Sequence, residues 1–102
     1  MATTEDFIQY VCEQIEGAGT IRYKKMFGEY LVYVDERPTL LVCDNTVYVK
    51  NKSFLDGILE NPEKGFPYDG AKEHLVLDIE DSEKAKTVAA VIVQNTPMPK
   101  RK

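Results

Sequence analysis

The spacing of apolar residues changes along the chain and divides it into a helical start, an extended middle and a mixed end. Near the N-terminus, apolar side chains recur at the spacing of one helix face: Phe7, Ile8, Val11, Cys12 and Ile15. Thr3 or Thr4 can cap this helix, and Gly17 and Gly19 end it. We expect this amphipathic helix to cover one face of a sheet.

Between residues 20 and 50 the apolar positions alternate instead, with the period of two that is typical of strands. Four short strands are predicted, over residues 20–25, 30–35, 39–43 and 46–50. A turn over residues 35–38 joins the second and third strands, and Asp44 with Asn45 forms a tight hairpin turn before the fourth. Such short connections require antiparallel neighbours, so the strands form a meander.

After residue 50, a short middle helix is predicted over residues 53–60, and Pro62 stops it. His74 begins a fifth strand over residues 74–79, and a last helix starts at Asp81 or Ser82. The predicted fold class is therefore α+β. It consists of a small antiparallel sheet of about five strands, flanking N-terminal and C-terminal helices, and one short middle helix.

The loop over residues 63–72 carries two aromatic side chains, Phe66 and Tyr68, on either side of Pro67. Aromatic side chains in small domains mostly fill the core, so packing of this loop against the domain is favoured. A stiff aromatic loop could instead act as a lid over a pocket, with Phe66 and Tyr68 as its covering residues.

Both faces of the predicted sheet are fairly apolar. In the second strand, Leu31 and Tyr33 point one way while Val32 and Val34 point the other. A sheet with one face in water alternates more cleanly between apolar and polar residues. The second face is therefore expected to be covered by another helix or to pair with a partner, and a homodimer is one form of such pairing.

Length and charge narrow the function classes. The 102 residues predict one domain over residues 1–96, followed by a flexible basic tail over residues 97–102. The net charge of -4 argues against a dedicated nucleic-acid binder, although a local basic surface is compatible with it. No signal peptide is evident, and no apolar run approaches the roughly 20 residues that cross a bilayer. We therefore expect a cytoplasmic protein without membrane contact.

Few residues suggest catalysis or metal binding. Cys12 and Cys43 form no CxxC pair, so we expect two buried thiols rather than a disulfide or a metal site. His74 is the one histidine, and Ser53 and Ser82 stand at predicted helix starts. The chain contains no phosphate-binding loop, HExxH or GxSxG motif. We therefore expect no enzyme activity, no cofactor, and no catalytic, cofactor-binding or metal-binding residues.

The segment over residues 22–30 combines cations with bulky apolar residues. It supplies the candidate contact group for a partner or an anion: Arg22, Lys24, Lys25, Met26, Phe27, Gly28 and Tyr30. Gly28 suits a corner between two strands because it has no Cβ. Arginine, methionine and phenylalanine are favoured at protein interfaces. The competing interpretation is a solvated strand edge, with Met26 and Phe27 directed into the core.

Two segments resemble the N-terminal domain of the TfoX (Sxy) family of bacterial competence regulators. They are Arg-x-Lys-Lys-Met-Phe-Gly-Glu-Tyr at residues 22–30 and the run over residues 41–50 that ends in Tyr-Val-Lys. The resemblance covers nearly the whole chain. It implies an α+β domain and a role in transcription, exercised on competence genes together with a cyclic-AMP receptor protein. The family's regulators have a second helical domain, which is not expected in these 102 residues, and Pro38-Thr39 departs from the aromatic-alanine pair expected there.

Three hypotheses about function follow. The favoured one is a non-enzymatic regulatory or protein-interaction module whose partner belongs to the transcription machinery or regulates it. The second is direct but weak nucleic-acid binding through the basic strand and the tail Lys100-Arg101-Lys102. The third is a small ligand-binding or enzymatic domain with the Phe66 and Tyr68 lid and His74 near its pocket.

Overall fold

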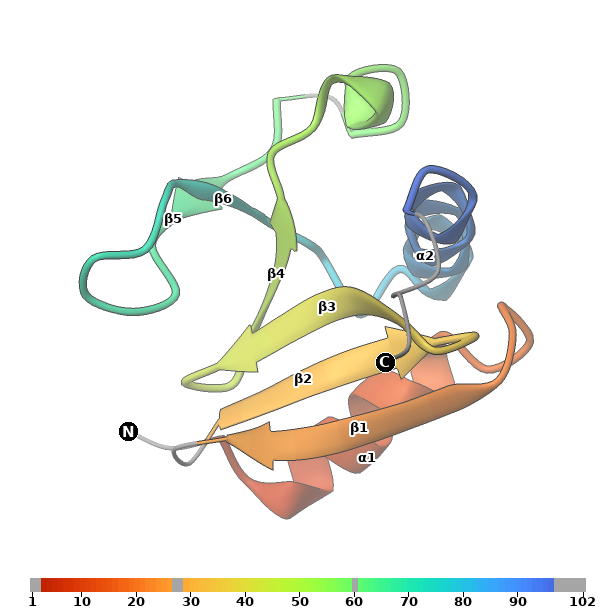
Figure 1. Ribbon diagram of the computed structural model, residues 1–102, viewed down its shortest axis with the longest axis vertical. Coiled ribbons are helices and arrows are strands. Elements are labelled where there is room, and N and C mark those ends of the chain that lie inside the picture. Colours follow the sequence, from red (N-terminus) through yellow and green to blue (C-terminus); the bar gives the residue numbers. More distant parts are fainter. Residues whose placement is uncertain (1–2, 27–28, 60, 97–102) are drawn as a thin grey trace, which may run out of the picture.

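The computed structural model describes residues 3–26, 29–59 and 61–96 and shows a sheet with helices against one side (Figure 1). In chain order the elements are α1 (Glu5–Gln14), β1 (Ile21–Met26), β2 (Glu29–Val34), β3 (Arg37–Cys43), β4 (Thr46–Lys50), η1 (Ser53–Leu55), β5 (Lys64–Gly65), β6 (His74–Val76) and α2 (Ser82–Gln94). The fold is α+β, as predicted. None of the described helices is long and apolar enough to cross a membrane.

Both α-helices begin at side-chain caps that satisfy otherwise unpaired backbone donors. The Thr4 hydroxyl accepts a hydrogen bond of 3.2 Å from the Phe7 backbone N–H at the start of α1. At the start of α2, the Asp81 carboxylate accepts one of 3.1 Å from the Lys84 N–H. Of the alternatives that the sequence left open, Thr4 and Asp81 are therefore the capping residues.

Two tight hairpins join β2 to β3 and β3 to β4. Asp35 and Glu36 have φ angles of 51° and 67°, and Asp44 and Asn45 have 51° and 55°. Positive φ at both central residues is the geometry that matches the twist of the flanking strands. The second hairpin is as predicted. The first is tighter than predicted, because Arg37 already begins β3.

The sheet has six antiparallel strands in the order β1-β2-β3-β4-β6-β5. The first four strands form the predicted meander. The strand predicted over residues 74–79 is shorter, because β6 ends at Val76. The edge strand β5 has two residues, too few to produce an alternating pattern in the sequence, and it was not predicted.

The predicted middle helix begins at Ser53, as expected, but it is shorter than predicted: over residues 53–59 the structure has a single 3-10 turn, η1. Gly57 follows that turn, and glycine disfavours a continuing helix by about 1 kcal/mol relative to alanine. Leu55 and Leu59 are nevertheless buried, as the predicted apolar face requires. The segment packs its apolar side chains without forming an α-helix.

One face of the sheet, the closed face, carries the hydrophobic core. In Figure 1, α1 lies behind β1 and β2, and α2 contacts both α1 and β3. The helices contribute Ile8, Val11 and Ile15 from α1 and Ala85, Val88, Ala89 and Ile92 from α2. The sheet contributes Tyr30, Val32, Val34, Leu40, Val42, Val47, Val49 and Leu75. Burial of these side chains supplies most of the driving force for folding.

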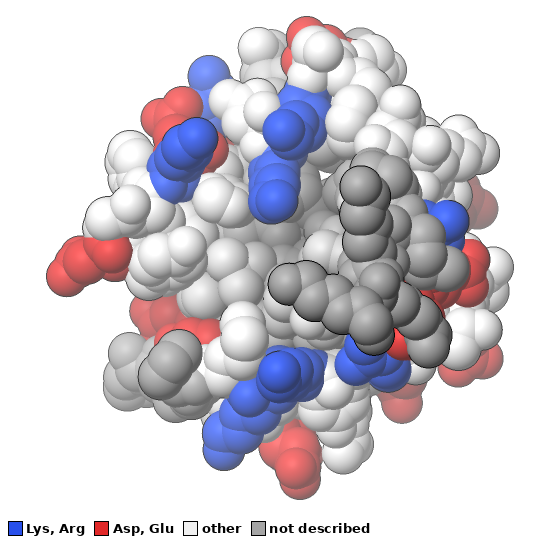
Figure 2. All heavy atoms as spheres, in the orientation of Figure 1, with Lys and Arg blue, Asp and Glu red and all other residues white. Residues whose placement is uncertain are grey.

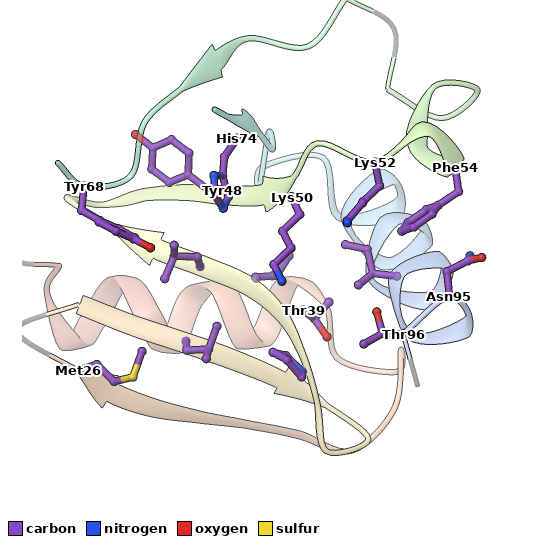
Figure 3. Close-up of a pocket in the computed structure, with 15 residues that line it drawn as sticks. Met26, Thr39, Tyr48, Lys50, Lys52, Phe54, Tyr68, His74, Asn95 and Thr96 are labelled. Carbon is purple, nitrogen blue, oxygen red and sulfur yellow. The ribbon is translucent and has the colours of Figure 1, made fainter. Parts of the chain in front are cut away.

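The other face, the open face, is covered only in part. Strand β2 alternates between buried and half-buried residues, so that Leu31 and Tyr33 stay half-buried while Val32 and Val34 have no exposed surface. Of the two coverings predicted for this face, a second helix or a partner, the helix is not found among the described residues. The C-terminal end of α2 and the side chain of Phe54 reach only its margin (Figure 3).

Candidate functional site

A trough lies on the open face, beside the C-terminal end of α2 (Figure 3). Its volume is about 430 Å³, within the range of roughly 300–1,000 Å³ that is usual for small-molecule sites. The trough is lined by Met26, Leu31, Pro38, Thr39, Leu40, Leu41, Tyr48, Lys50, Lys52, Phe54, Tyr68, His74, Ile92, Asn95 and Thr96. These residues come from strands, loops and α2, so the trough exists only in the folded domain.

The floor and both ends of the trough are apolar. Leu31 and Leu41 are direct partners in the β2–β3 register and are both half-buried. Tyr68 stands at one end, while Phe54 stands at the other, next to Asn95 (Figure 3). The half-exposed floor is a place where water would be displaced favourably by an apolar group.

The trough's titratable side chains other than Tyr48 and Tyr68 are all basic: Lys50, Lys52 and His74. Among the described residues, no Asp or Glu lines the trough, although the whole chain has 17 acidic against 13 basic residues. In the part of the chain that the structure describes, neither lysine forms an ion pair. Figure 2, which looks onto this face, shows Lys and Arg atoms above and below its centre. The open face is thus locally positive on an acidic protein.

His74 is fixed in one tautomer by its backbone contact. Its Nδ1 lies 2.7 Å from the Lys72 carbonyl oxygen. A carbonyl oxygen can only accept, so Nδ1 carries the proton and Nε2 presents a lone pair when the ring is neutral. The ring packs edge-on against Tyr48, with the two centroids 6.5 Å apart. His74 can therefore hold a fixed orientation at the trough.

Tyr48 of β4 is positioned by a glycine on the edge strand β5, which lies beyond β6 in the sheet. A Cβ at Gly65 would lie 3.2 Å from the Tyr48 ring, closer than a normal contact. The missing side chain thus leaves room for the Tyr48 ring to reach from β4 toward β5. Burial of the hydroxyl, with smaller effects of the nearby Cys43 and carboxylates, raises the pKa of Tyr48.

The C-terminal end of α2 is tied to the β2–β3 hairpin by Arg37. Its Nε donates a hydrogen bond of 2.8 Å to the Thr96 carbonyl, and a terminal nitrogen donates one of 3.1 Å to the Asp35 carbonyl. Because Thr96 and its neighbour Asn95 line the trough, these two hydrogen bonds help to fix that wall.

The structure brings together only part of the contact group predicted from residues 22–30. Along β1, Arg22, Lys24 and Met26 share the open face with Leu31, and Met26 lines the trough. By the same alternation Lys25 points to the other side. Tyr30 is buried with 5% of its surface exposed, so it belongs to the core. Phe27 and Gly28 lie outside the described residues, as does the predicted tail.

Arg22 already has partners within the chain. Its guanidinium donates to Glu36 at 2.8 and 3.2 Å and lies 4.2 Å from the centre of the Tyr33 ring. The hydrogen bond from Arg22 to Glu36 is the main cause of the raised pKa of this arginine. Both ionic side chains are about half exposed, so water screens the pair and its contribution to stability is small.

The aromatic loop differs from the favoured prediction. Phe66 and Tyr68 are 63% and 60% exposed, so the loop does not pack into the core. Tyr68 instead lines the trough, as the lid interpretation requires, whereas Phe66 is not among the lining residues. A cavity next to this loop and to His74 is the feature on which the ligand-binding hypothesis depended.

Sequence reasoning missed the structural role of Glu29. One of its carboxylate oxygens accepts hydrogen bonds from the Thr3 N–H at 3.2 Å, the Thr3 hydroxyl at 2.8 Å and the Asp44 N–H at 3.0 Å. The residue therefore joins the start of β2 to the N-terminal segment and to the β3–β4 hairpin. An acidic residue after Met-Phe-Gly was the only signal for it in the sequence.

The two cysteines are free thiols in different surroundings. Cys43 is buried, as expected, while Cys12 is only half-buried. Burial, followed by the nearby charges of Glu29 and Asp44, raises the pKa of Cys43 to about 11. Burial also raises the pKa of Cys12. Among residues 3–26, 29–59 and 61–96, no group of three or more His, Cys, Asp or Glu side chains is placed to hold a metal ion.

Comparison with known proteins identifies one informative relative. The chain is 35% identical over 102 residues to a Spirochaeta aurantia protein named as an uncharacterized 12.7 kDa protein in the trpE 5′ region. The alignment covers 98% of this chain and 89% of the relative. No family model matches the sequence.

Proposed function

We propose that this chain, which belongs to the same family as the Spirochaeta aurantia protein, is a non-enzymatic regulatory module that binds a protein partner. The observation that carries the proposal is the open face of the sheet, where half-buried apolar side chains lie beside the cations of β1. The resemblance of residues 22–30 and 41–50 to the TfoX N-terminal domain supports a partner in the transcription machinery, and hence action in the cytoplasm.

The surface that we assign to the partner contains Arg22, Lys24 and Met26 of β1 and Tyr33 of β2. They share one face of an antiparallel pair, in which Arg22 is opposite Tyr33. Arginine, tyrosine and methionine are enriched at the centres of protein interfaces. Lys24 adds an exposed charge that can select an acidic partner surface and accelerate association.

Strand β1 adds a second element suited to recognition, because it forms one edge of the sheet. An edge strand presents backbone N–H and C=O groups to solvent and can pair with a strand of another chain. Its lysines discourage pairing with copies of itself, since like charges would then meet. The strand therefore favours an acidic partner over self-association into a homodimer.

A photocrosslinking experiment tests the proposal. A benzophenone amino acid replaces Tyr33, and the chain is expressed at low level in bacterial cells that naturally carry it. We expect a crosslink to a transcription regulator or a polymerase subunit. Lys24→Glu should reduce that crosslink at least about fivefold because it reverses the charge facing an acidic partner. The matched control is Lys86→Glu, on the exposed side of α2.

The outcomes separate the proposal from its rivals. A crosslink that Lys24→Glu and Lys86→Glu affect equally would remove β1 from the contact surface. The absence of any crosslinked protein at Tyr33 would contradict the proposed function. A complex with duplex DNA that weakens steeply as salt rises would favour direct nucleic-acid binding through the cations of β1 instead.

A further inference from the structure

We propose that the trough on the open face is a binding site for a small carboxylic acid with an elongated apolar body. The site is defined by the floor residues Leu31 and Leu41, the rim cations Lys50 and Lys52, and His74. This inference goes beyond the proposed partner surface and does not depend on it.

The apolar part of the ligand is inferred from the floor. Leu31 and Leu41 are adjacent across β2 and β3 and remain half-buried in the free protein. Figure 3 shows the trough extending from Tyr68 past these strands toward Phe54 and Asn95. A linear hydrocarbon lying along this direction would cover the floor and gain the free energy of burying apolar surface.

The charge of the ligand is inferred from the rim. Lys50 is the last residue of β4, and Lys52 follows two positions later, so both ammonium groups reach the same side of the trough (Figure 3). Within residues 3–26, 29–59 and 61–96, neither lysine is paired with a carboxylate and no acidic residue lines the trough. An anionic group at this rim would meet two cations without displacing an internal partner.

His74 adds directional specificity beside these cations. Since its Nδ1 donates to the Lys72 carbonyl, the ring presents Nε2 as the atom available to a ligand. The Tyr48 ring packs edge-on against this ring, and Lys50 is the residue opposite His74 in the β4–β6 register.

The dimensions favour a small molecule over a protein segment. A volume of about 430 Å³ accommodates a medium-chain acid. Walls contributed by β1, β4, α2 and the Tyr68 loop surround the floor on several sides. A partner surface as assigned above would instead contact β1, where Arg22 and Lys24 lie outside the set of lining residues.

The test uses octanoate as the probe and octanamide as its uncharged counterpart. Dissociation constants are obtained from amide shifts in two-dimensional NMR spectra of the purified 102-residue chain. We expect octanoate to bind at least about tenfold more tightly than octanamide because only the acid meets the lysines as an anion. Equal affinities would overturn the assigned role of the rim.

Charge-neutralising variants locate the site. The double substitution Lys50→Gln and Lys52→Gln should weaken octanoate binding at least about fivefold while leaving octanamide binding unchanged. Both positions are exposed, so the fold should tolerate the change. Lys84→Gln with Lys86→Gln removes the same charge from α2 and should change the affinity less than about twofold. Equal effects of the two pairs would indicate nonspecific attraction.

A chain-length series tests the apolar floor independently of any variant. Affinity should rise about tenfold from butyrate to hexanoate and again to octanoate, since each step buries two more methylene groups. No binding of any of these acids at millimolar concentration would overturn the inference. If that happened while the Tyr33 crosslink persisted, the proposed partner function would stand without this ligand site.

Discussion

The two faces of the sheet are built from alternate residues of the same strands, yet one face is buried and the other is only partly covered. On the closed face, Val32, Val34 and Leu40 have no exposed surface beneath the helices. On the open face, Leu31 and Leu41 are equally apolar but only half-buried, and cations surround them. Apolar character alone therefore does not mark a core position. What distinguishes the faces is whether another element of the chain covers them.

The largest expected effect is a difference in stability between alanine substitutions of the neighbours Leu40 and Leu41. Leu40→Ala should lower the free energy of unfolding by about 3 kcal/mol because it leaves a cavity in the core. Leu41→Ala should cost about 1 kcal/mol, since its side chain is already partly in water. Urea unfolding of both variants measures the difference. Similar losses for the two would mean that the open face is part of the core.

The next largest effect is a difference in stability between substitutions of two ionic residues, Glu29 and Arg22, at opposite ends of the β1–β2 pair. Glu29→Ala should cost about 2 kcal/mol because three donors from Thr3 and Asp44 lose a charged acceptor. Arg22→Ala should cost less than about 1 kcal/mol, because its pair with Glu36 is exposed. Thermal unfolding at one pH gives both values, and the reverse ranking would rule out the anchoring role of Glu29.

A smaller effect concerns the dependence of stability on pH. The pKa of Cys43 is about 11 in the folded protein, against 9.0 for an ordinary thiol. Between these values the unfolded chain loses a proton that the folded chain keeps, so stability decreases as pH rises from 9 to 11. Cys43→Ala should lose less stability than the natural chain between pH 8 and pH 10 in urea unfolding. If both chains lose the same stability between pH 8 and pH 10, folding does not raise the pKa of the Cys43 thiol.

The smallest expected effect is a difference in octanoate affinity between substitutions of Tyr68 and Phe66, the two exposed aromatic residues of the loop. Tyr68→Ala should weaken octanoate binding about threefold, because Tyr68 covers one end of the trough. Phe66→Ala is the matched control and should leave the affinity unchanged, since Phe66 does not line the trough. Neither substitution should shift the midpoint of unfolding, because both side chains are more than half exposed. Equal changes in affinity would argue against a covering role for Tyr68.

The fold could be predicted from local sequence signals wherever an element is periodic and bounded by its own caps or turns. Thr4, Asp81 and the Asp44-Asn45 hairpin are such signals. The middle helix starts at Ser53 as predicted but is only a 3-10 turn, because Gly57 disfavours a continuing α-helix despite the apolar spacing. The two-residue β5 was missed because pairing with β6, rather than a pattern of its own, defines it.

The candidate site was less predictable because it depends on contacts between distant segments. One hypothesis placed Tyr68 and His74 at the same pocket, and Met26 was singled out separately. Nothing in the sequence placed Lys50, Lys52 and Ile92 around that pocket. The alternation that grouped Arg22 with Lys24 was visible. The exposure of Phe66 and Tyr68 could not be predicted from the sequence. An aromatic residue in a loop packs or stays in solvent according to the space that the rest of the fold leaves around it.

The central claim is that binding takes place on the open face, and a methyl-resolved NMR titration with octanoate tests it most directly. We expect shifts at the methyl groups of Leu31 and Leu41, which line the trough on the open face. The methyl groups of Val32, Val34 and Val42 on the closed face should stay in place. Shifts centred on the closed face, or spread equally over both faces, would contradict the claim.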